Sequence, residues 1–235
     1  MCTVSYVCSG DKIIITSNRD EQVLRPALAP KNYTINNRNV IFPKDPKAGG
    51  TWYALDEDLN IAVLLNGAAE KHKWNPPYRK SRGLIVIEMI GSGSPLQHWE
   101  TLDLDNIEPF TIVLSEKRKL YQLRWDGNQK ETVKKDESQN HIWSSTTLYP
   151  KEIRELREEW FHRFLEAKPQ VGETEMFDFH RYTQSENNEN GLVINRNEKL
   201  KTLSITQTVI DKNKAAMVHH DLIEKNKSAH SFIIV

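Results

Sequence analysis

The second residue of the chain is the first candidate for chemistry. Cys2 follows the initiator Met1 and precedes the small, polar Thr3. Cysteine is small enough to permit removal of Met1, which would leave a thiol and a free α-amine on one residue. Because the unperturbed pKa is about 7.7–8.0 for an α-amine and about 8.5 for a thiol, the amine can accept the thiol proton near neutral pH. The alternative is that Cys2 is an ordinary small residue at the start of a strand.

A polar block, Asn18-Arg19-Asp20-Glu21, is the second candidate. A hairpin centred on Gly10 would place residues near 18 opposite residue 2. A neighbouring arginine favours a thiolate, and a carboxylate can hold an α-amine in position. Strand alternation sends Arg19 and Asp20 to opposite faces unless the strand ends or bulges there. The alternative interpretation is a solvated strand end with a local ion pair.

These residues need a scaffold of strands, and the first half of the chain predicts one. β-Branched runs over residues 3–8 and 12–17 predict a hairpin. Residues 51–55 and 61–65 repeat the pattern. The intervening residues 21–50, which hold four prolines, predict a long irregular loop of the kind that is often functional.

The rest of the chain predicts two pairs of helices and further hairpins. Ser94-Pro95 has the residue types of an N-cap and first helical position. The charged stretch 126–140 predicts a solvated loop. Helices are expected at 83–91, 95–102, 151–167 and 173–182, and strands at 110–114, 120–125, 141–146, 203–210 and 216–220. We therefore expect one α+β domain over residues 1–235 with mostly antiparallel sheets.

Composition excludes several classes of partner. The chain has 235 residues, with 32 Lys plus Arg and 32 Asp plus Glu, so no excess positive charge favours nucleic acid or an acidic membrane surface. Its longest apolar runs, 61–65 and 84–87, are too short for membrane insertion. Cys2 and Cys8 lie roughly 20 Å apart along one strand, too far for a disulfide. Without a CxxC, HExxH or Cys/His cluster, we expect no metal site. A cytoplasmic protein of unknown oligomeric state is the expectation.

At several places the sequence resembles a known family. Met1-Cys2-Thr3, Asn18-Arg19-Asp20-Glu21, Arg25-Pro26, Ala48-Gly49-Gly50-Thr51-Trp52 and Leu64-Leu65-Asn66-Gly67 occur in order, and Arg79-Lys80-Ser81-Arg82-Gly83 continues the match. These blocks resemble the NRDE family, also called the transport and Golgi organisation 2 family. That family is similar to N-terminal nucleophile hydrolases of the choloylglycine hydrolase and penicillin acylase type. The resemblance implies a four-layer αββα fold and a catalytic Cys2 exposed by removal of Met1.

The resemblance also implies roles for single residues. Cys2 would be the nucleophile and, through its amine, the base. Arg19 and Asp20 would be its electrostatic partners, with Asn18 or Glu21 able to fill one of these places. Asn66 would help to bind the oxyanion, a donor worth roughly 3 kcal/mol in acyl transfer. The alternative for Asn66 is a turn residue that satisfies its own backbone.

Asn18 and Glu21 are also candidates for contact with a substrate, and three further residues join them. Trp52 follows Gly49-Gly50, which could form a pocket wall or a turn before a strand with a core tryptophan. His72 lies in a basic, aromatic loop that could be a lid or plain surface. Thr146 belongs to Ser144-Ser145-Thr146-Thr147, where the hydrolases carry a second asparagine. The late arginine of the hydrolases is also replaced, since Lys201-Thr202-Leu203-Ser204 offers only a lysine.

The leading hypothesis is hydrolysis of a non-peptide C–N bond in a small amide. Its alternative is a carrier on the same fold, because the family has been linked to haem handling and to lipid homeostasis. We expect a small-molecule ligand or substrate and no cofactor, with haem as a candidate bound ligand only.

Overall fold

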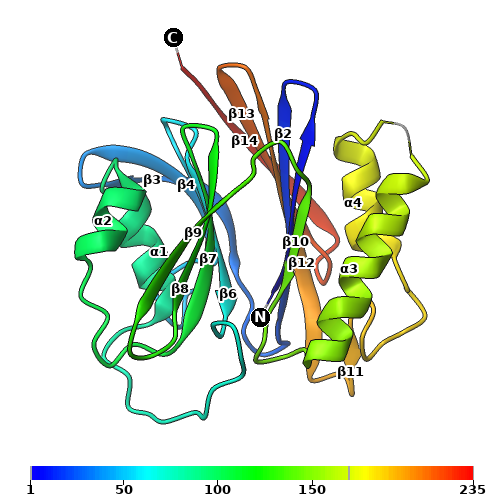
Figure 1. Cartoon of the computed structure of the whole chain (residues 1–235), viewed down its shortest axis with the longest axis horizontal. Coiled ribbons are helices and arrows are strands. Elements are labelled where there is room, and N and C mark those ends of the chain that lie inside the picture. The colour runs from blue at the N-terminus through cyan, green and yellow to red at the C-terminus, as the bar shows by residue number, and fades with distance from the viewer. Residues whose placement is uncertain (1, 169, 235) are drawn as a thin grey trace.

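The computed structural model describes residues 2–168 and 170–234, and for Cys2 it describes the backbone alone. Within these residues the chain forms two seven-stranded antiparallel sheets that face each other (Figure 1). The first sheet has the order β10–β1–β2–β12–β13–β14, with β11 paired to β12. Its strands are β1 Cys2–Ser9, β2 Lys12–Gln22, β10 His141–Ser144, β11 Asn195–Arg196, β12 Leu200–Asp211, β13 Lys214–Asp221 and β14 Asn226–Ile233.

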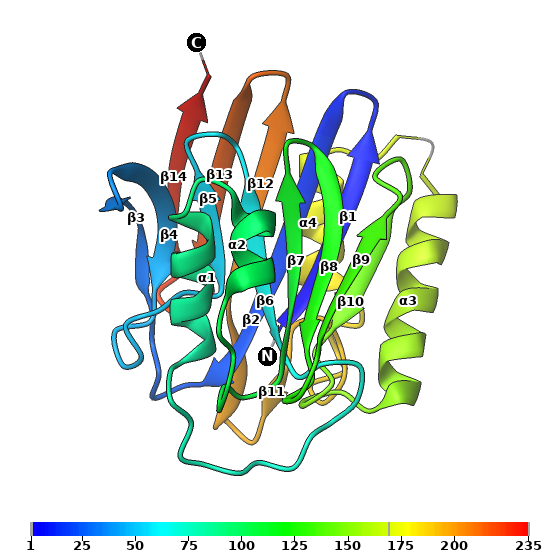
Figure 2. The ribbon, with the colours of Figure 1, turned by 60° about the vertical axis from the view of Figure 1, so that its left-hand side comes forward.

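The second sheet runs in chain order from β3 to β9. Its strands are β3 Leu28–Ile35, β4 Arg38–Lys44, β5 Tyr53–Asp56, β6 Ile61–Asn66, β7 Phe110–Glu116, β8 Lys119–Trp125 and β9 Lys130–Lys135. The helices are α1 Arg82–Ile90, α2 Pro95–Thr101, α3 Lys151–Glu166 and α4 Glu173–Tyr182. Helices α1 and α2 cover the outer face of the second sheet, and α3 and α4 cover the first (Figures 1 and 2). The expected four-layer αββα arrangement is confirmed.

Strand β2 lies in the middle of this arrangement and is buried on both faces. All its residues from 13 to 21 are buried. Ile13 and Ile15 belong to the core between the sheets, whereas Ile14 belongs to a second core beneath α3 and α4. Because side chains alternate along a strand, β2 supplies one layer with its odd positions and the other with its even positions.

The sequence-based expectation for three segments is wrong. Residues 21–50 contain the hairpin of β3 and β4, residues 126–140 contain β9, and β14 follows the last expected strand. Strands β3, β9 and β14 are sheet edges, where solvent satisfies half of the backbone and apolar alternation is not required. Prolines and lysines are common on such edges, which is why Pro30 in β3 and the Lys-rich β9 looked like loop. Ser94 precedes α2 as expected, but its side chain makes no capping hydrogen bond.

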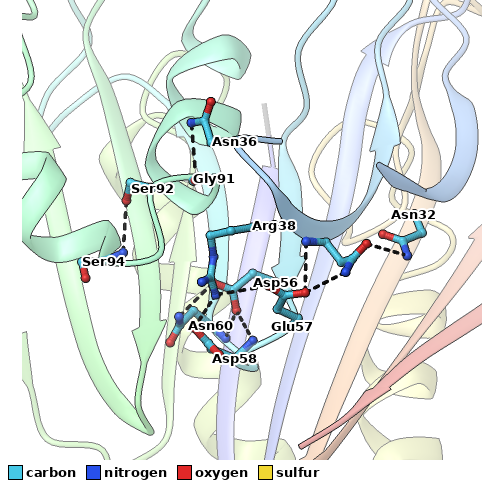
Figure 3. Close-up of polar contacts among 11 residues, drawn as sticks. Asn32, Asn36, Arg38, Asp56, Glu57, Asp58, Asn60, Gly91, Ser92 and Ser94 are labelled. Atoms are coloured by element: carbon cyan, nitrogen blue, oxygen red, sulfur yellow. Dashed lines mark hydrogen bonds and ion pairs between the residues drawn. The ribbon is translucent and has the colours of Figure 1, made fainter. Parts of the chain in front are cut away.

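A polar cluster closes the hairpin of β5 and β6. Figure 3 shows Arg38, Asp56, Asp58 and Asn60 gathered at this turn. Asp56 Oδ1 accepts hydrogen bonds from the backbone N–H of Asp58 at 3.0 Å and of Asn60 at 2.8 Å. Burial raises the pKa of Asp56 to about 6, although the hydrogen bonds from Asn60 oppose this. The cluster fixes one end of β6, the strand that carries Asn66 at its other end.

Close packing of two glycines fixes the start of α1. The backbone N–H of Thr51 donates to the carbonyl of Gly83 at 3.1 Å. A Cβ added to Gly50 would lie 2.4 Å from the carbonyl carbon of Gly83, and one added to Gly83 would lie 2.8 Å from the carbonyl oxygen of Thr51. Both clashes are with backbone, which cannot rotate away. The glycines therefore let α1 begin directly against the link between β4 and β5.

No helix within the described ranges is long and apolar enough to cross a membrane.

We expect Gly83→Ala to lower the free energy of unfolding by about 1–3 kcal/mol, since the added methyl group must displace backbone. Urea unfolding measures this difference. Gln97→Ala, at an exposed position of α2, is the control and should change stability by less than about 0.5 kcal/mol. Wild-type stability of Gly83→Ala would contradict the close approach.

Candidate functional site

The hairpin of β1 and β2 sets the polar block opposite Cys2. In the register of these strands Cys2 pairs with Arg19 and Thr3 pairs with Asn18, as the sequence predicts. The side chain of Cys2 lies outside the described residues. On its other edge β2 pairs with β12, whose register shifts between Thr202 and Ser204. Thr202 pairs with Asp20 and Ser204 pairs with Arg19, so the irregular part of the β2–β12 ladder lies beside the candidate site.

Arg19 and Asp20 are directed to opposite faces of the sheet. Arg19 faces the second sheet, where its guanidinium lies 4.5 Å from the ring centre of Trp52. Asp20 faces the helices and accepts hydrogen bonds from Tyr149 at 2.7 Å and Thr202 at 2.6 Å. Asp20 is fully buried and Arg19 is 4% exposed. The alternative of a solvated strand end is therefore wrong.

The face that carries Arg19 borders a cavity of about 80 Å³ between the two sheets. Asn66 at the end of β6 lines it, as do Trp52 and Glu21. Among the residues that complete its wall are Arg25, Asp45 and Arg82. The cavity is thus lined by five of the expected site residues with described side chains, since Asp20 also borders it.

Ion pairs order the charged wall of this cavity. Arg25 contacts Asp45 at 2.6 Å and Glu21 at 3.3 Å. Arg19 donates to the backbone carbonyl of Arg25 at 3.0 Å and lies 4.0 Å from Asp45. The turn after β2 is thereby tied back to β2. Because all these groups are held by partners, the wall is preorganised for a polar ligand.

On the opposite face of β2, one arginine joins the helices to the sheet. Arg157 of α3 is fully buried. Its guanidinium lies 3.5 Å from the ring centre of Tyr149, donates to Thr3 Oγ1, and donates to the backbone carbonyls of Asn190 and Gly191. Burial raises the pKa of Asp20, and the charge of Arg157 opposes this. Arg157 therefore stabilises both strands that flank the candidate nucleophile.

Asn18 belongs to this helix-facing network and not to the cavity. Its Nδ2 donates to the carbonyls of His180 at 3.0 Å and Leu192 at 2.6 Å. Because Nδ2 is the donor, its Oδ1 accepts from His180 Nδ1, so His180 Nε2 accepts from Ser5 Oγ at 2.7 Å. Both ends of the Asn18 amide are engaged on the helix side of β2, away from the cavity, and its expected contact with a substrate stays a prediction.

Comparison of the sequence with models of known families identifies the family of this chain. The sequence model described as Transport and Golgi organisation 2 matches residues 1–228. The chain belongs to the transport and Golgi organisation 2 family. No curated protein sequence matches it.

Three solved structures similar to this chain are those of hydrolases. An N-acylethanolamine-hydrolyzing acid amidase ortholog from Caenorhabditis elegans has a TM-score of 0.53 at 12% identity, covering 89% of this chain and 92% of its own. A variant of the conjugated bile acid hydrolase from Clostridium perfringens has a TM-score of 0.56 at 9% identity, covering 97% and 92%. A second variant of that enzyme has a TM-score of 0.51 at 9% identity, covering 100% and 97%. At these identities the likeness shows the fold alone.

Two of the residues expected to contact a substrate, His72 and Thr146, do not line the cavity. His72 Nε2 lies 3.2 Å from Glu108 Oε1, and Glu108 also contacts Arg82 at 2.9 Å. His72 therefore supports the cavity wall from behind. Thr146 donates to the carbonyl of Glu70 at 3.3 Å and lines a separate cavity. Both residues support the loop after Asn66, and a substrate contact at either one stays a prediction.

The segment Ser144-Ser145-Thr146-Thr147 packs behind Asn66. Ser145 Oγ donates to the backbone carbonyl of Asn66 at 2.8 Å. A Cβ added to Gly67 would lie 2.1 Å from Thr146 Oγ1. The hydroxyl groups therefore fix the backbone of the Asn66-Gly67 turn.

Several polar residues of the site escaped sequence reasoning. They are Arg25, Asp45, Arg82, Tyr149, Arg157, Thr202 and His180. Arg157 had a detectable signal, because it lies in the apolar stripe of α3, four residues before Phe161, where a charged residue is rarely buried without partners. Thr202 and His180 had none, since only the fold brings them to β2. Among the described residues, no cluster of three or more His, Cys, Asp or Glu could hold a metal ion.

We expect Arg157→Leu to lower the free energy of unfolding by about 3–5 kcal/mol, because it leaves two buried carbonyls and Thr3 without their donor and removes the positive charge that favours the buried Asp20 carboxylate. Tyr149→Phe should cost about 1–3 kcal/mol through the loss of one hydrogen bond to Asp20. Denaturant unfolding measures both changes. Arg163→Leu, on the exposed side of the same helix, is the control. Equal stability of the Arg157 and Arg163 variants would refute the structural role of Arg157.

The pH dependence of stability should report His180. Burial lowers the pKa of His180 to about 3 and that of His219 to about 4. Since both folded pKa values are below the unfolded value near 6.5, the unfolded state binds more protons between these limits. The contribution of these two imidazoles to stability should therefore be complete above pH 6.5 and be lost as the pH drops. Replacing one of these histidines should reduce the slope of the unfolding free energy against pH by up to about 1.4 kcal/mol per pH unit.

The measurement compares urea unfolding of the wild type and His180→Gln from pH 7 to pH 5. The variant should lose less stability over this range. His230→Gln, in the edge strand β14, is the control and should keep the wild-type slope. An unchanged slope in His180→Gln would show that the imidazole is not buried in its neutral form.

Proposed function

We propose that this protein is an N-terminal cysteine hydrolase that cleaves the amide C–N bond of a small molecule. The observation that supports this most directly is the pairing of Cys2 with Arg19. That register sets residue 2 beside an arginine that borders the cavity, and Asn66 lines the same cavity. The family resemblance supplies the roles, and the fold is that of enzymes described as an acid amidase and a bile acid hydrolase.

In the proposed reaction the amine of the processed Cys2 accepts the thiol proton, and the thiolate attacks the amide carbonyl carbon. The oxyanion that forms accepts a hydrogen bond from the side-chain amide of Asn66. The C–N bond then breaks, and the leaving nitrogen takes the proton from the α-ammonium group. Water hydrolyses the thioester, adding its hydroxyl to the acyl group and returning a proton to the thiol.

Arg19 and Asp20 have different parts in this proposal. The guanidinium of Arg19 is almost completely buried against Trp52, where a fixed positive charge favours a nearby thiolate. Each oxygen of Asp20 already accepts one hydrogen bond. Because a carboxylate oxygen can accept a second, the spare capacity of Asp20 would hold the α-ammonium group. The carrier alternative remains a sequence-based hypothesis.

The first test is the reactivity of Cys2. The mature chain should lack Met1, and Cys2 should react with iodoacetamide at neutral pH faster than Cys8, which lacks the α-amine and borders the β1–β2 turn. Mass spectrometry of the native and alkylated protein measures both. Quantitative retention of Met1, or a slower reaction at Cys2 than at Cys8, would refute the enzyme and favour the carrier.

The second test separates Asn66 from the nucleophile. With a library of N-acyl aminocoumarin amides, Asn66→Ala should lower kcat by roughly 10²–10³-fold. Alkylation of Cys2 in the same variant should keep its wild-type rate, since that reaction forms no oxyanion. Asn32→Ala, on the exposed edge strand β3, is the control for both measurements. Full turnover by Asn66→Ala would remove Asn66 from the catalytic residues.

A further inference from the structure

Two buried hydrogen-bond donors at the cavity lack an acceptor. Within the described part of the chain, neither Nε1 of Trp52 nor Nε of Arg25 has a hydrogen-bond partner. Both residues line the cavity, and Trp52 is only 6% exposed. Buried polar groups in folded proteins are nearly always paired. Because an indole and a guanidinium can only donate, the group that completes this site must be an acceptor.

Positive charge exceeds negative charge on the cavity side of β2. Three arginines from separate segments line the cavity: Arg19 from β2, Arg25 from the next turn and Arg82 from the start of α1. The acidic groups directed to this side are Glu21 and Asp45, because both oxygens of Asp20 are engaged on the helix side. The lining therefore favours a ligand with one negative charge.

Arg82 is the arginine best placed to meet that ligand. Its acidic partner Glu108 is not part of the cavity lining, and Glu108 is shared with His72. Arg82 Nη1 donates to the carbonyl of Pro109 at 3.1 Å. These contacts orient the guanidinium from behind the wall. A guanidinium held in this way can present its remaining N–H groups to an oxyanion.

The N-terminus of α1 adds to the same end of the cavity. Ser81, Arg82 and Gly83 line it. The N-cap Ser81 makes no side-chain capping hydrogen bond, and the first turn of this nine-residue helix holds no acidic residue. The positive end of the helix dipole is therefore not neutralised by its own sequence, and such an end favours an anion.

We propose that this end of the cavity binds a small oxyanion, held by Arg82, the N-terminus of α1 and the indole N–H of Trp52. A cavity of about 80 Å³ accommodates a group of a few heavy atoms, such as a carboxylate, and the rest of a ligand extends toward solvent. That the oxyanion belongs to the amide substrate rests on the proposed function, whereas its binding does not.

The binding test follows the Trp52 indole N–H by nuclear magnetic resonance, with the signal assigned from Trp52→Phe. The probes are acetate, inorganic phosphate and, as the neutral analogue of acetate, acetamide. Acetate should shift the signal to saturation and acetamide should not. A shift with phosphate alone would identify a tetrahedral oxyanion in place of a carboxylate. No response to either anion, or an equal response to acetamide, would overturn the proposal.

Two variants test the residues assigned to the site. Arg82→Gln should weaken anion binding about tenfold or more, because a charge-assisted hydrogen bond is lost. Ser81→Asp should abolish it while supporting the helix, since its carboxylate caps α1 and occupies the anion position. Arg79→Gln is the matched control, an exposed arginine from the same loop whose contacts are with Asp103 and Asp105, and it should bind acetate as the wild type does. Wild-type binding by Ser81→Asp would overturn the assignment.

A kinetic test connects the oxyanion to the nucleophile. In the processed protein the ratio of alkylation rates with iodoacetate and iodoacetamide should be at least about tenfold larger at Cys2 than at Cys8, and Ser81→Asp should remove the difference. Fast reaction of Cys2 without preference for iodoacetate would overturn the link to the substrate and leave the hydrolase proposal intact. A Cys2 no faster than Cys8 with either reagent, together with acetate binding at Trp52, would refute the hydrolase and support the oxyanion site.

Discussion

The candidate site depends on the contacts of the buried guanidinium of Arg157. It contacts Thr3, the neighbour of Cys2, and stacks on Tyr149, whose hydroxyl group donates to Asp20. A charge removed from water is costly unless hydrogen bonds replace its hydration, and here backbone carbonyls and Thr3 supply them. A register of β1 against β2 that moved Thr3 away from α3 would remove one of these partners. The network therefore favours the one register that sets Cys2 opposite Arg19.

Strand β2 separates two kinds of chemistry by simple alternation. On its helix side Asn18 is hydrogen-bonded to His180 of α4, and Asp20 accepts hydrogen bonds from Tyr149, just before α3, and from Thr202 of β12. The odd positions Arg19 and Glu21 of β2 border the cavity between the sheets. The polar block therefore does not act as one cluster. Half of it holds the sheet to its helix side, and the other half borders the cavity. The two roles are coupled because both faces belong to one strand.

The fold is shared with proteins whose sequences are too different from this chain to show a common function. Solved hydrolases share this architecture at 9–12% identity, and a shared fold does not establish a shared reaction. What this chain adds to the fold is particular to its own residues. Hydroxyl groups, not a second amide, support the turn at Asn66, and three arginines with two carboxylates form the cavity wall. In the proposed site a ligand would therefore be selected by charge and hydrogen-bond donors more than by apolar contact.

The sequence alone determined much of the scaffold. β-Branched runs and turn residues predicted the hairpin of β1 and β2, with residues near 18 opposite residue 2, and apolar periodicity predicted α3. These signals are local, because each depends on one element placing its apolar side chains on a common face. Order and spacing of short blocks identified the family. Edge strands such as β9 and β14 were missed because solvent, which makes no demand on side-chain pattern, covers one of their edges.

Only the tertiary structure decided which residues meet at the site. Arg25, Asp45 and Arg82 come from three segments, and Arg157 and His180 lie far along the chain from β2. The structure also shows that the cavity lining does not include Asn18, His72 or Thr146. A sequence shows which residues can ionise or donate, but their partners depend on how sheets and helices stack. Burial then makes those partners obligatory, since an unpaired polar group is costly only where water cannot reach it.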